Sequence, residues 1–155
     1  MAHILIVDDD ELIAEMASEI LINEGHACGW VTSGEDALDL LRHRRPDLLL
    51  LDNDMPGLTG PQVLRRIRGS ARDYDLPVIM FTGITGAQDE QAALYAGAQD
   101  YVRKPFDPRS LLHKVNLVLK ARAERPRHRE LVDVLASQSG WQERKPMPPA
   151  FRSVC

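Results

Sequence analysis

The sequence is poor in cysteine, in aromatic residues and in long apolar runs. Its two cysteines, Cys28 and Cys155, are too few for a disulfide framework, which fits a reducing, cytoplasmic location. Apolar stretches such as ILIV and LLLL are far shorter than the roughly 20 residues that span a bilayer, so we expect no membrane association. The N-terminal MAHILIVDDD lacks the basic region that opens a secretory signal.

Positive charge is also scarce over most of the chain. The net charge is −4, and the 23 acidic residues outnumber the 19 lysines and arginines. The excess of acid lies in the first 120 residues, which argues against a surface for duplex nucleic acid. No DNA-binding domain is recognisable, and we expect no direct nucleic-acid binding. The basic stretch RAERPRHR is either an attraction for an acidic partner or a solvated helix end.

Short apolar runs alternate five times with helical patterns. The expected strands are HILIV (3–7), ACGWVT (27–32), DLLLL (47–51), PVIMFT (77–82) and QDYVR (99–103). Helices are expected over 11–24, after the capping pattern Ser33-x-x-Asp36, from Gly60-Pro61, from Thr85-x-x-Gln88 to about Gly97, and from Asp107-Pro108 through Leu119. Five such repeats predict a parallel sheet with helices on both faces.

The pattern loosens near residue 122. We therefore expect one domain over 1–122 and an extension over 123–155. The extension contains RELVDVLA, which predicts one more helix within 127–136. The remainder is rich in proline and polar residues and is expected to be a flexible tail.

Polar residues gather where the expected strands end. The run from Asp8 to Glu11 follows the first strand, Asp52 and Asp54 follow the third, Thr82 ends the fourth, and Lys104 follows the fifth. In an open α/β sheet the ligand site lies beyond the carboxyl ends of the strands. The sequence therefore predicts that acids, a hydroxyl and one lysine meet at one edge of the sheet.

Carboxylates crowded together repel each other unless protons or a cation neutralise them. The predicted site has no cysteine and no histidine pair, so zinc is not supported. All-oxygen ligation suits Mg²⁺, with Mn²⁺ as an alternative. A metal, a lysine and a hydroxyl can hold a phosphoryl group on a carboxylate nucleophile, so this set predicts metal-dependent phosphoryl transfer to an aspartate.

Four motifs make the chain recognisable: ILIVDDD, LLLLDNDMPGLTG, VIMFTG and DYVRKPF. In this order and spacing, over residues 1–122, the sequence resembles the receiver domain of bacterial two-component response regulators of the chemotaxis-regulator type. The resemblance implies a flavodoxin-like, doubly wound (βα)5 fold. It also implies a five-stranded parallel sheet in the order 2-1-3-4-5.

The resemblance assigns a role to each matching residue. Asp52 is the phosphoacceptor and a metal ligand, and Asp9 is the second direct ligand. The remaining roles are an indirect metal contact for Asp8, a metal-binding backbone carbonyl for Asp54, the switch hydroxyl for Thr82, a phosphate contact for Lys104, the switch aromatic for Tyr101, and a cis peptide for Lys104-Pro105.

The function implied is a phosphorylation switch rather than a conventional enzyme. A sensor histidine kinase or a histidine phosphotransfer protein would supply the phosphoryl group, and the protein would catalyse its own phosphorylation and autodephosphorylation. The face formed by the fourth helix, the fifth strand and the last helix would then change its affinity for an unknown protein target. The same face is the one expected to form a homodimer.

Two positions depart from the family's common pattern. Asp54 is acidic where many members are neutral, and Ile84 is apolar. The family ties both positions to dephosphorylation rate, so the lifetime of the phosphorylated state is left open.

Within the family, the chain is either a stand-alone regulator or the receiver segment of a larger regulator or hybrid kinase. Two interpretations outside the family fit the sequence less well. A phosphatase of the haloacid-dehalogenase type would carry its nucleophile after the first core strand, and a flavodoxin-like electron carrier would have a loop rich in Ser, Thr and Gly where this chain has DDDE.

Overall fold

A computed structural model describes residues 1–83, 91, 92, 94 and 96–124. The elements in chain order are β1 (His3–Val7), α1 (Glu11–Asn23), β2 (Ala27–Val31), α2 (Gly34–Leu41), β3 (Leu48–Asp52), α3 (Gly60–Arg68), β4 (Val78–Thr82), β5 (Asp100–Arg103) and α5 (Pro108–Glu124). The chain divides into the units Met1–Arg122 and Ala123–Cys155. The predicted cap at Thr85, the departure at Ile84 and the helix within 127–136 lie outside the described residues.

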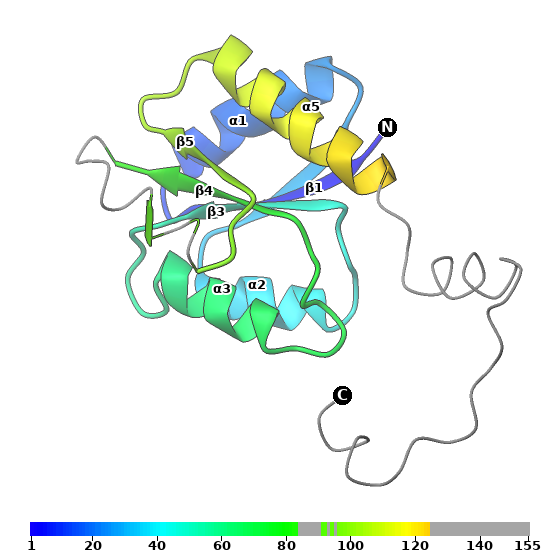
Figure 1. The fold of residues 1–155 in the computed structure, drawn as a ribbon. Helices are drawn as coiled ribbons and strands as arrows, with labels where there is room; N and C mark the ends of the chain where they lie inside the picture. Colours follow the sequence, from blue (N-terminus) through cyan, green and yellow to red (C-terminus); the bar gives the residue numbers. More distant parts are fainter. Residues whose placement is uncertain (84–90, 93, 95, 125–155) are drawn as a thin grey trace, which may run out of the picture. The chain divides into compact units, whose positions relative to one another are not determined.

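The five strands form one parallel sheet in the order β2-β1-β3-β4-β5. The fold class and strand order expected from the sequence are therefore confirmed. Figure 1 shows α1 and α5 on one face of the sheet and α2 and α3 on the other. Such coverage is what an all-parallel sheet needs, because its strands are apolar on both sides.

The leucine run of β3 shows how the two faces are filled. Leu48 and Leu50 pack into the cluster that includes apolar residues of α1 and α5, whereas Leu49 and Leu51 pack into the cluster of α2 and α3. Successive side chains of a strand point to opposite faces, so an unbroken apolar run serves both layers. All four leucines are fully buried.

The helices start at polar caps. The Asp10 carboxylate accepts from the backbone N–H groups of Leu12 and Ile13, which makes Asp10 the cap of α1. Ser33 caps α2 as the sequence predicts. Thr59 and Gln62, on either side of Gly60 and Pro61, form a reciprocal capping box at the start of α3. The sequence prediction did not include this box.

The element ends differ slightly from the prediction. β3 runs from Leu48 to Asp52, so Asp52 is the last strand residue rather than the first after the strand. The reason is that Asp52 still pairs with Phe81 of β4. α5 continues to Glu124, beyond the expected end at Leu119.

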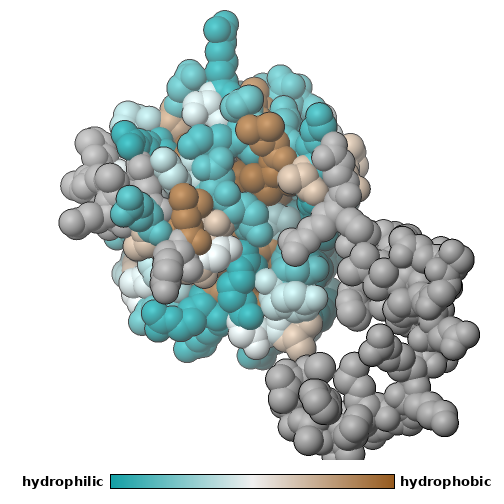
Figure 2. Space-filling view, viewed as in Figure 1, coloured by the Kyte–Doolittle hydropathy of each residue, from teal (hydrophilic) through white to brown (hydrophobic). Residues whose placement is uncertain are grey.

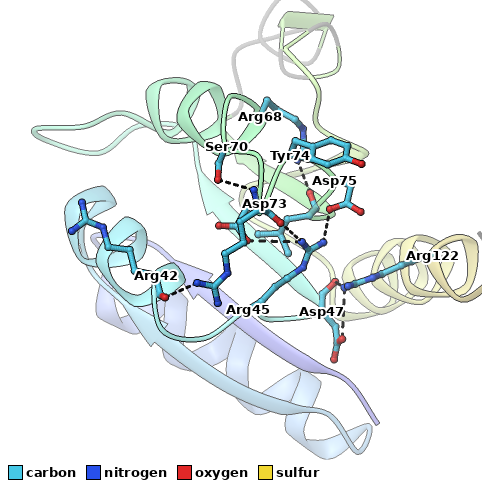
Figure 3. A network of polar contacts seen from close by, with 11 residues as sticks. Arg42, Arg45, Asp47, Arg68, Ser70, Asp73, Tyr74, Asp75 and Arg122 are labelled. Carbon is cyan, nitrogen blue, oxygen red and sulfur yellow. Dashed lines mark hydrogen bonds and ion pairs between the residues drawn. The ribbon is translucent and has the colours of Figure 1, made fainter. Parts of the chain in front are cut away.

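Arginines tie the loops together at the amino-terminal edge of the sheet (Figure 3). Arg45 donates to Asp75 over 2.7 Å, and Arg122 of α5 donates to the backbone carbonyl of Asp47. Arg68 donates to the carbonyl oxygens of Tyr74, Leu76 and Gly97. Every one of these acceptors precedes a strand, so the network fixes the end of the sheet opposite to the predicted site.

The outer surface in the view of Figure 2 is mostly hydrophilic, with separate hydrophobic patches. Large apolar side chains that are at least one-third exposed include Leu12, Met16, Ile22 and Leu117 of the helices. Among the described residues, none of the helices combines the length and the apolar character that a membrane crossing requires.

Candidate functional site at the carboxyl edge of the sheet

Two buried carboxylates lie at adjacent strand ends. Asp8 follows β1 and is fully buried, and Asp52 ends β3 with 4% of its surface exposed. β1 and β3 are hydrogen-bonded neighbours, so the two side chains meet beside each other. Strand alternation places Asp52 on the α1/α5 side with Leu48 and Leu50.

Lys104 joins the two carboxylates. Its Nζ lies 2.7 Å from Asp8 Oδ2 and 3.0 Å from Asp52 Oδ1, across the sheet from the end of β5. The backbone N–H of Lys104 donates to the carbonyl of Thr82 over 2.8 Å, which holds this residue next to the end of β4. One ammonium group therefore pairs with two buried acids at once.

The electrostatics of this group are strongly perturbed. Burial, with smaller contributions from Asp8 and Asp9, raises the pKa of Asp52 to about 7 against the lowering effect of Lys104. Burial also opposes the charge of Lys104, but its contacts with Asp8 and Asp52 outweigh that effect and raise its pKa. The site therefore holds a charged lysine beside a carboxyl group that retains a proton more readily than usual.

The carboxylates of Asp8, Asp9 and Asp52 offer oxygens that all lie within 4.8 Å of one another. Two of them are buried and Asp9 is exposed, so the set faces solvent on one side. Hard oxygen donors at this spacing fit Mg²⁺ or Mn²⁺, which keep several waters when bound. The structure thus brings together the three side chains that the sequence predicts around a metal.

The remaining predicted residues lie around this group. Thr82 ends β4, is 1% exposed, and its Oγ1 has no hydrogen-bond partner within the described part of the chain. The Asp54 side chain is exposed, while its backbone N–H donates to Asp52 Oδ1 over 3.3 Å. The peptide bond between Lys104 and Pro105 is cis.

Tyr101 is the second residue of β5, the strand at the edge of the sheet. It is partly buried against the α2/α3 cluster. Lys114 of α5 contacts Tyr101 in two ways. Its Nζ lies 4.3 Å from the ring centroid and donates to the Tyr101 backbone carbonyl. The predicted role of Tyr101 as a switch aromatic stays a prediction.

The sequence reasoning missed some residues next to the site. Phe106 stacks on Phe81, with ring centroids 5.7 Å apart and an interplanar angle of 12°. Glu35 of α2 accepts from the backbone N–H of Leu58 over 3.2 Å, in the loop that follows Asp54. Both contacts join segments that are distant in the chain, 23 positions apart in the second case, and no local pattern marks either of them.

Comparisons with known proteins agree on one family. The model of the response regulator receiver domain family matches residues 4–116. The chain is 40% identical over 124 residues to the DNA-binding response regulator MtrA of Mycolicibacterium smegmatis, covering 80% of this chain and 53% of that protein. It is 41% identical to the transcriptional regulatory protein AfsQ1 of Streptomyces coelicolor, covering 81% of this chain and 54% of the relative.

A solved structure extends the likeness to the fold. The chemotaxis response regulator CheY4 of Vibrio cholerae matches with a TM-score of 0.72 and 30% identity, over 76% of this chain and 98% of that one. By contrast, the chain spans about half the length of the curated relatives it matches.

The relatives overturn one expectation. The sequence led us to expect no direct nucleic-acid binding, yet MtrA is named as a DNA-binding response regulator. The expectation is wrong because it was drawn from the charge of residues 1–120 and from the lack of a DNA-binding domain in a chain that spans only 53% of this relative. The composition of one segment does not decide what a longer regulator binds.

Proposed function

Because the chain belongs to the response regulator receiver domain family, we propose that it receives a phosphoryl group on Asp52 from a phosphohistidine. The donor is a sensor histidine kinase or a histidine phosphotransfer protein, and the reaction takes place in the cytoplasm. The observation that carries the proposal is the position of Lys104 Nζ between Asp8 and Asp52, 2.7 Å and 3.0 Å from their oxygens.

The transfer is a displacement at phosphorus. A carboxylate oxygen of Asp52 attacks, a P–O bond forms, and the P–N bond to the donor imidazole breaks. The electron pair of that bond stays on the imidazole nitrogen, which takes a proton. Lys104 stands where its ammonium can pair with a phosphoryl oxygen, because it already contacts Asp52 Oδ1.

The carboxylates of Asp8, Asp9 and Asp52 would hold Mg²⁺, or Mn²⁺ in its place, together with the backbone carbonyl of Asp54. When bound, the metal supplies positive charge that offsets the negative charge of the phosphoryl group. Asp9 is the most accessible of the three carboxylates, which supports its proposed role as a direct ligand, with Asp8 acting indirectly. The exposed Asp54 side chain can lie at the rim of the site.

Thr82 supports a switch that follows phosphorylation. Its buried hydroxyl has no partner among the described residues, and an unpaired buried hydroxyl is stabilised by a new acceptor. A phosphoryl group on Asp52 would provide that acceptor and draw Thr82 toward it. We propose that Tyr101 responds and that the surface around β5 and α5 then changes its affinity for a target.

The likeness to MtrA and AfsQ1 supports an output in the control of transcription. We propose that residues 1–122 form the receiver unit of such a regulator and that residues 123–155 extend beyond it. The phosphorylated receiver would then regulate a DNA-binding part, in the same chain or in another one. The phosphatase interpretation is disfavoured because the receiver domain family model matches residues 4–116.

The test is phosphorylation by a small phosphodonor with Mg²⁺, followed by intact-mass measurement. We expect one added phosphoryl group on the wild type and none when EDTA removes the metal. Asp52→Asn should abolish the addition, because an amide is not a nucleophile toward phosphorus. Asp39→Asn, an exposed carboxylate on α2, is the matched control and should be labelled like the wild type.

Two results would contradict the proposal. A wild-type protein that remains unmodified under these conditions refutes the receiver function. Labelling of Asp52→Asn at the wild-type level would instead show that another residue accepts the phosphoryl group.

A further inference from the structure

Lys104 has a demanding position for a flexible side chain. Its ammonium must stay between two buried carboxylates, yet a lysine stem has four rotatable carbons and loses much rotamer freedom when fixed. A group that acts on a reacting phosphoryl is effective only when its surroundings hold it in place. The question is therefore which contacts of the described residues hold Lys104.

The backbone of Lys104 is anchored to the end of β4. Its N–H donates to the Thr82 carbonyl over 2.8 Å, which continues the pairing of β4 and β5 by one residue. Beyond Lys104 the chain leaves the sheet, and the next regular anchor is the start of α5, where the Asp107 carbonyl accepts from Leu111. The short loop between these points carries the lysine side chain.

Phe106 provides the second anchor of this loop. Its ring stacks on Phe81, with a centroid separation of 5.7 Å and an interplanar angle of 12°. Phe81 is fully buried in β4 and pairs with Asp52 in the strand register. The stacked ring thus ties the loop to the strand residue that lies beside the phosphoacceptor.

The ring of Phe81 also lies near the Lys104 ammonium. Lys104 Nζ lies 5.8 Å from the centroid of Phe81, at the outer limit of a cation–π contact. Phe81 therefore stacks with Phe106 and also lies near the Lys104 ammonium. We expect a change at Phe106 to alter both the loop that carries Lys104 and the ring that its ammonium approaches.

We propose that Phe106 is a positioning residue for the phosphoryl-transfer site: stacked on Phe81, it holds Lys104 between Asp8 and Asp52. The inference rests on the proposed function, since it gives Phe106 a part in the same reaction. Phe106 does not touch the phosphoryl group. It acts through Lys104.

Packing alone would also explain a partly buried aromatic at this position, so the test must separate the two roles. Phe106→Leu keeps an apolar side chain but removes the stacking ring, and Phe106→Tyr keeps the ring. Val118→Ala removes volume from the hydrophobic cluster against which Phe106 packs, but Val118 lies later in α5. This variant is the control for lost stability. All variants are made in the full chain.

The first readout is the reactivity of Lys104 itself, measured without metal or phosphodonor. Trace acetylation with acetic anhydride, followed by peptide mass spectrometry, compares Lys104 with the other lysines. Phe106→Leu should make Lys104 several-fold more reactive, because its ammonium is released from the carboxylates. Phe106→Tyr and Val118→Ala should leave Lys104 as protected as in the wild type.

The second readout is the rate of phosphorylation by the small phosphodonor at saturating Mg²⁺. Phe106→Leu should lower this rate about tenfold, whereas Phe106→Tyr and Val118→Ala should keep the wild-type rate. The affinity for Mg²⁺ should not fall, because the carboxylates are intact.

The outcomes are distinguishable from a failure of the proposed function. If the wild type accepts a phosphoryl group but Phe106→Leu behaves like Val118→Ala in both measurements, the positioning role is wrong and Phe106 only packs. If the wild type accepts none, the proposed function fails, and the acetylation experiment still decides whether Phe106 holds Lys104.

Discussion

At the scale of single residues, three charged groups dominate the carboxyl edge of the sheet. Asp8 and Asp52 are buried beside each other, and Lys104 contacts both. One positive charge against two buried negative charges leaves the site electrostatically incomplete. Burial is the main cause of the raised pKa of Asp52, about 7, and the neighbouring Asp8 and Asp9 contribute to it against Lys104. A divalent cation would offset the excess of negative charge.

The raised pKa of Asp52 predicts that the stability of the metal-free protein depends on pH. The pKa of Asp52 is higher in the folded protein than the ordinary value in an unfolded chain, so the folded state holds a proton that the unfolded state loses. The contribution of Asp52 to the free energy of unfolding therefore falls as pH rises from about 4 to about 7. Asp52→Asn has no carboxyl group to titrate, so it does not lose stability in this way. In EDTA its free energy of unfolding, relative to that of the wild type, should rise by about 2 kcal/mol between roughly pH 5 and pH 8.

Urea unfolding at both pH values checks this prediction. Asp39→Asn on the exposed face of α2 should follow the wild type. Added Mg²⁺ should stabilise the wild type more than Asp52→Asn, because the variant lacks one ligand. A relative stability of Asp52→Asn that does not change with pH would show that the Asp52 carboxyl has an ordinary pKa.

At the scale of elements, side chains from one segment hold the ends of others. Arg68 of α3 is the clearest case, because its guanidinium donates to backbone carbonyls before both β4 and β5. Burial lowers its pKa, yet its planar fork matches several acceptors at once. Glu35 does the same for the loop after β3, through Leu58.

Arg68 gives a stability prediction. Arg68→Lys keeps the charge but cannot reach the carbonyls of Tyr74, Leu76 and Gly97 together, so some of these carbonyls lose their donor. The free energy of unfolding should fall by about 2 kcal/mol. Arg65→Ala, an exposed position on the same helix, should change it by less than about 0.5 kcal/mol. Chemical denaturation measures both, and equal effects would show that the Arg68 contacts contribute nothing specific.

At the scale of the whole molecule, two apolar clusters on opposite faces of one sheet carry the site. α5 belongs to the cluster that it shares with α1, through Leu111, Val115 and Val118. Its last described turn adds the contact between Arg122 and Asp47. The receiver unit that we propose therefore needs α5 to its end.

Truncation tests this unit. A chain that ends at Glu124 keeps these contacts and should melt within about 2 °C of the full chain. A chain that ends at Val115 loses Val118 and Arg122, and its melting temperature should fall by about 10 °C. Thermal unfolding followed by circular dichroism measures both. A large loss in the longer fragment would show that residues 125–155 stabilise the fold.

The sequence by itself determined the fold class, the strand order and the family. Runs such as LLLL signal strands buried on both faces, and caps such as Ser33 signal helix starts, because these patterns depend on neighbouring positions alone. The meeting of Asp8, Asp52 and Lys104 also followed, since parallel strands end at a common edge.

Only the tertiary structure decided how those residues are held. The bridge of Lys104 between two carboxylates, the stack of Phe106 on Phe81 and the grip of Arg68 on Gly97 join segments that are distant in the chain. Their partners are chosen by packing geometry, which no local pattern encodes. Asp10 is a further example. It stands in the same acidic run as Asp8 and Asp9, so the sequence does not distinguish it from them, but in the structure it caps α1 and does not join their carboxylate group.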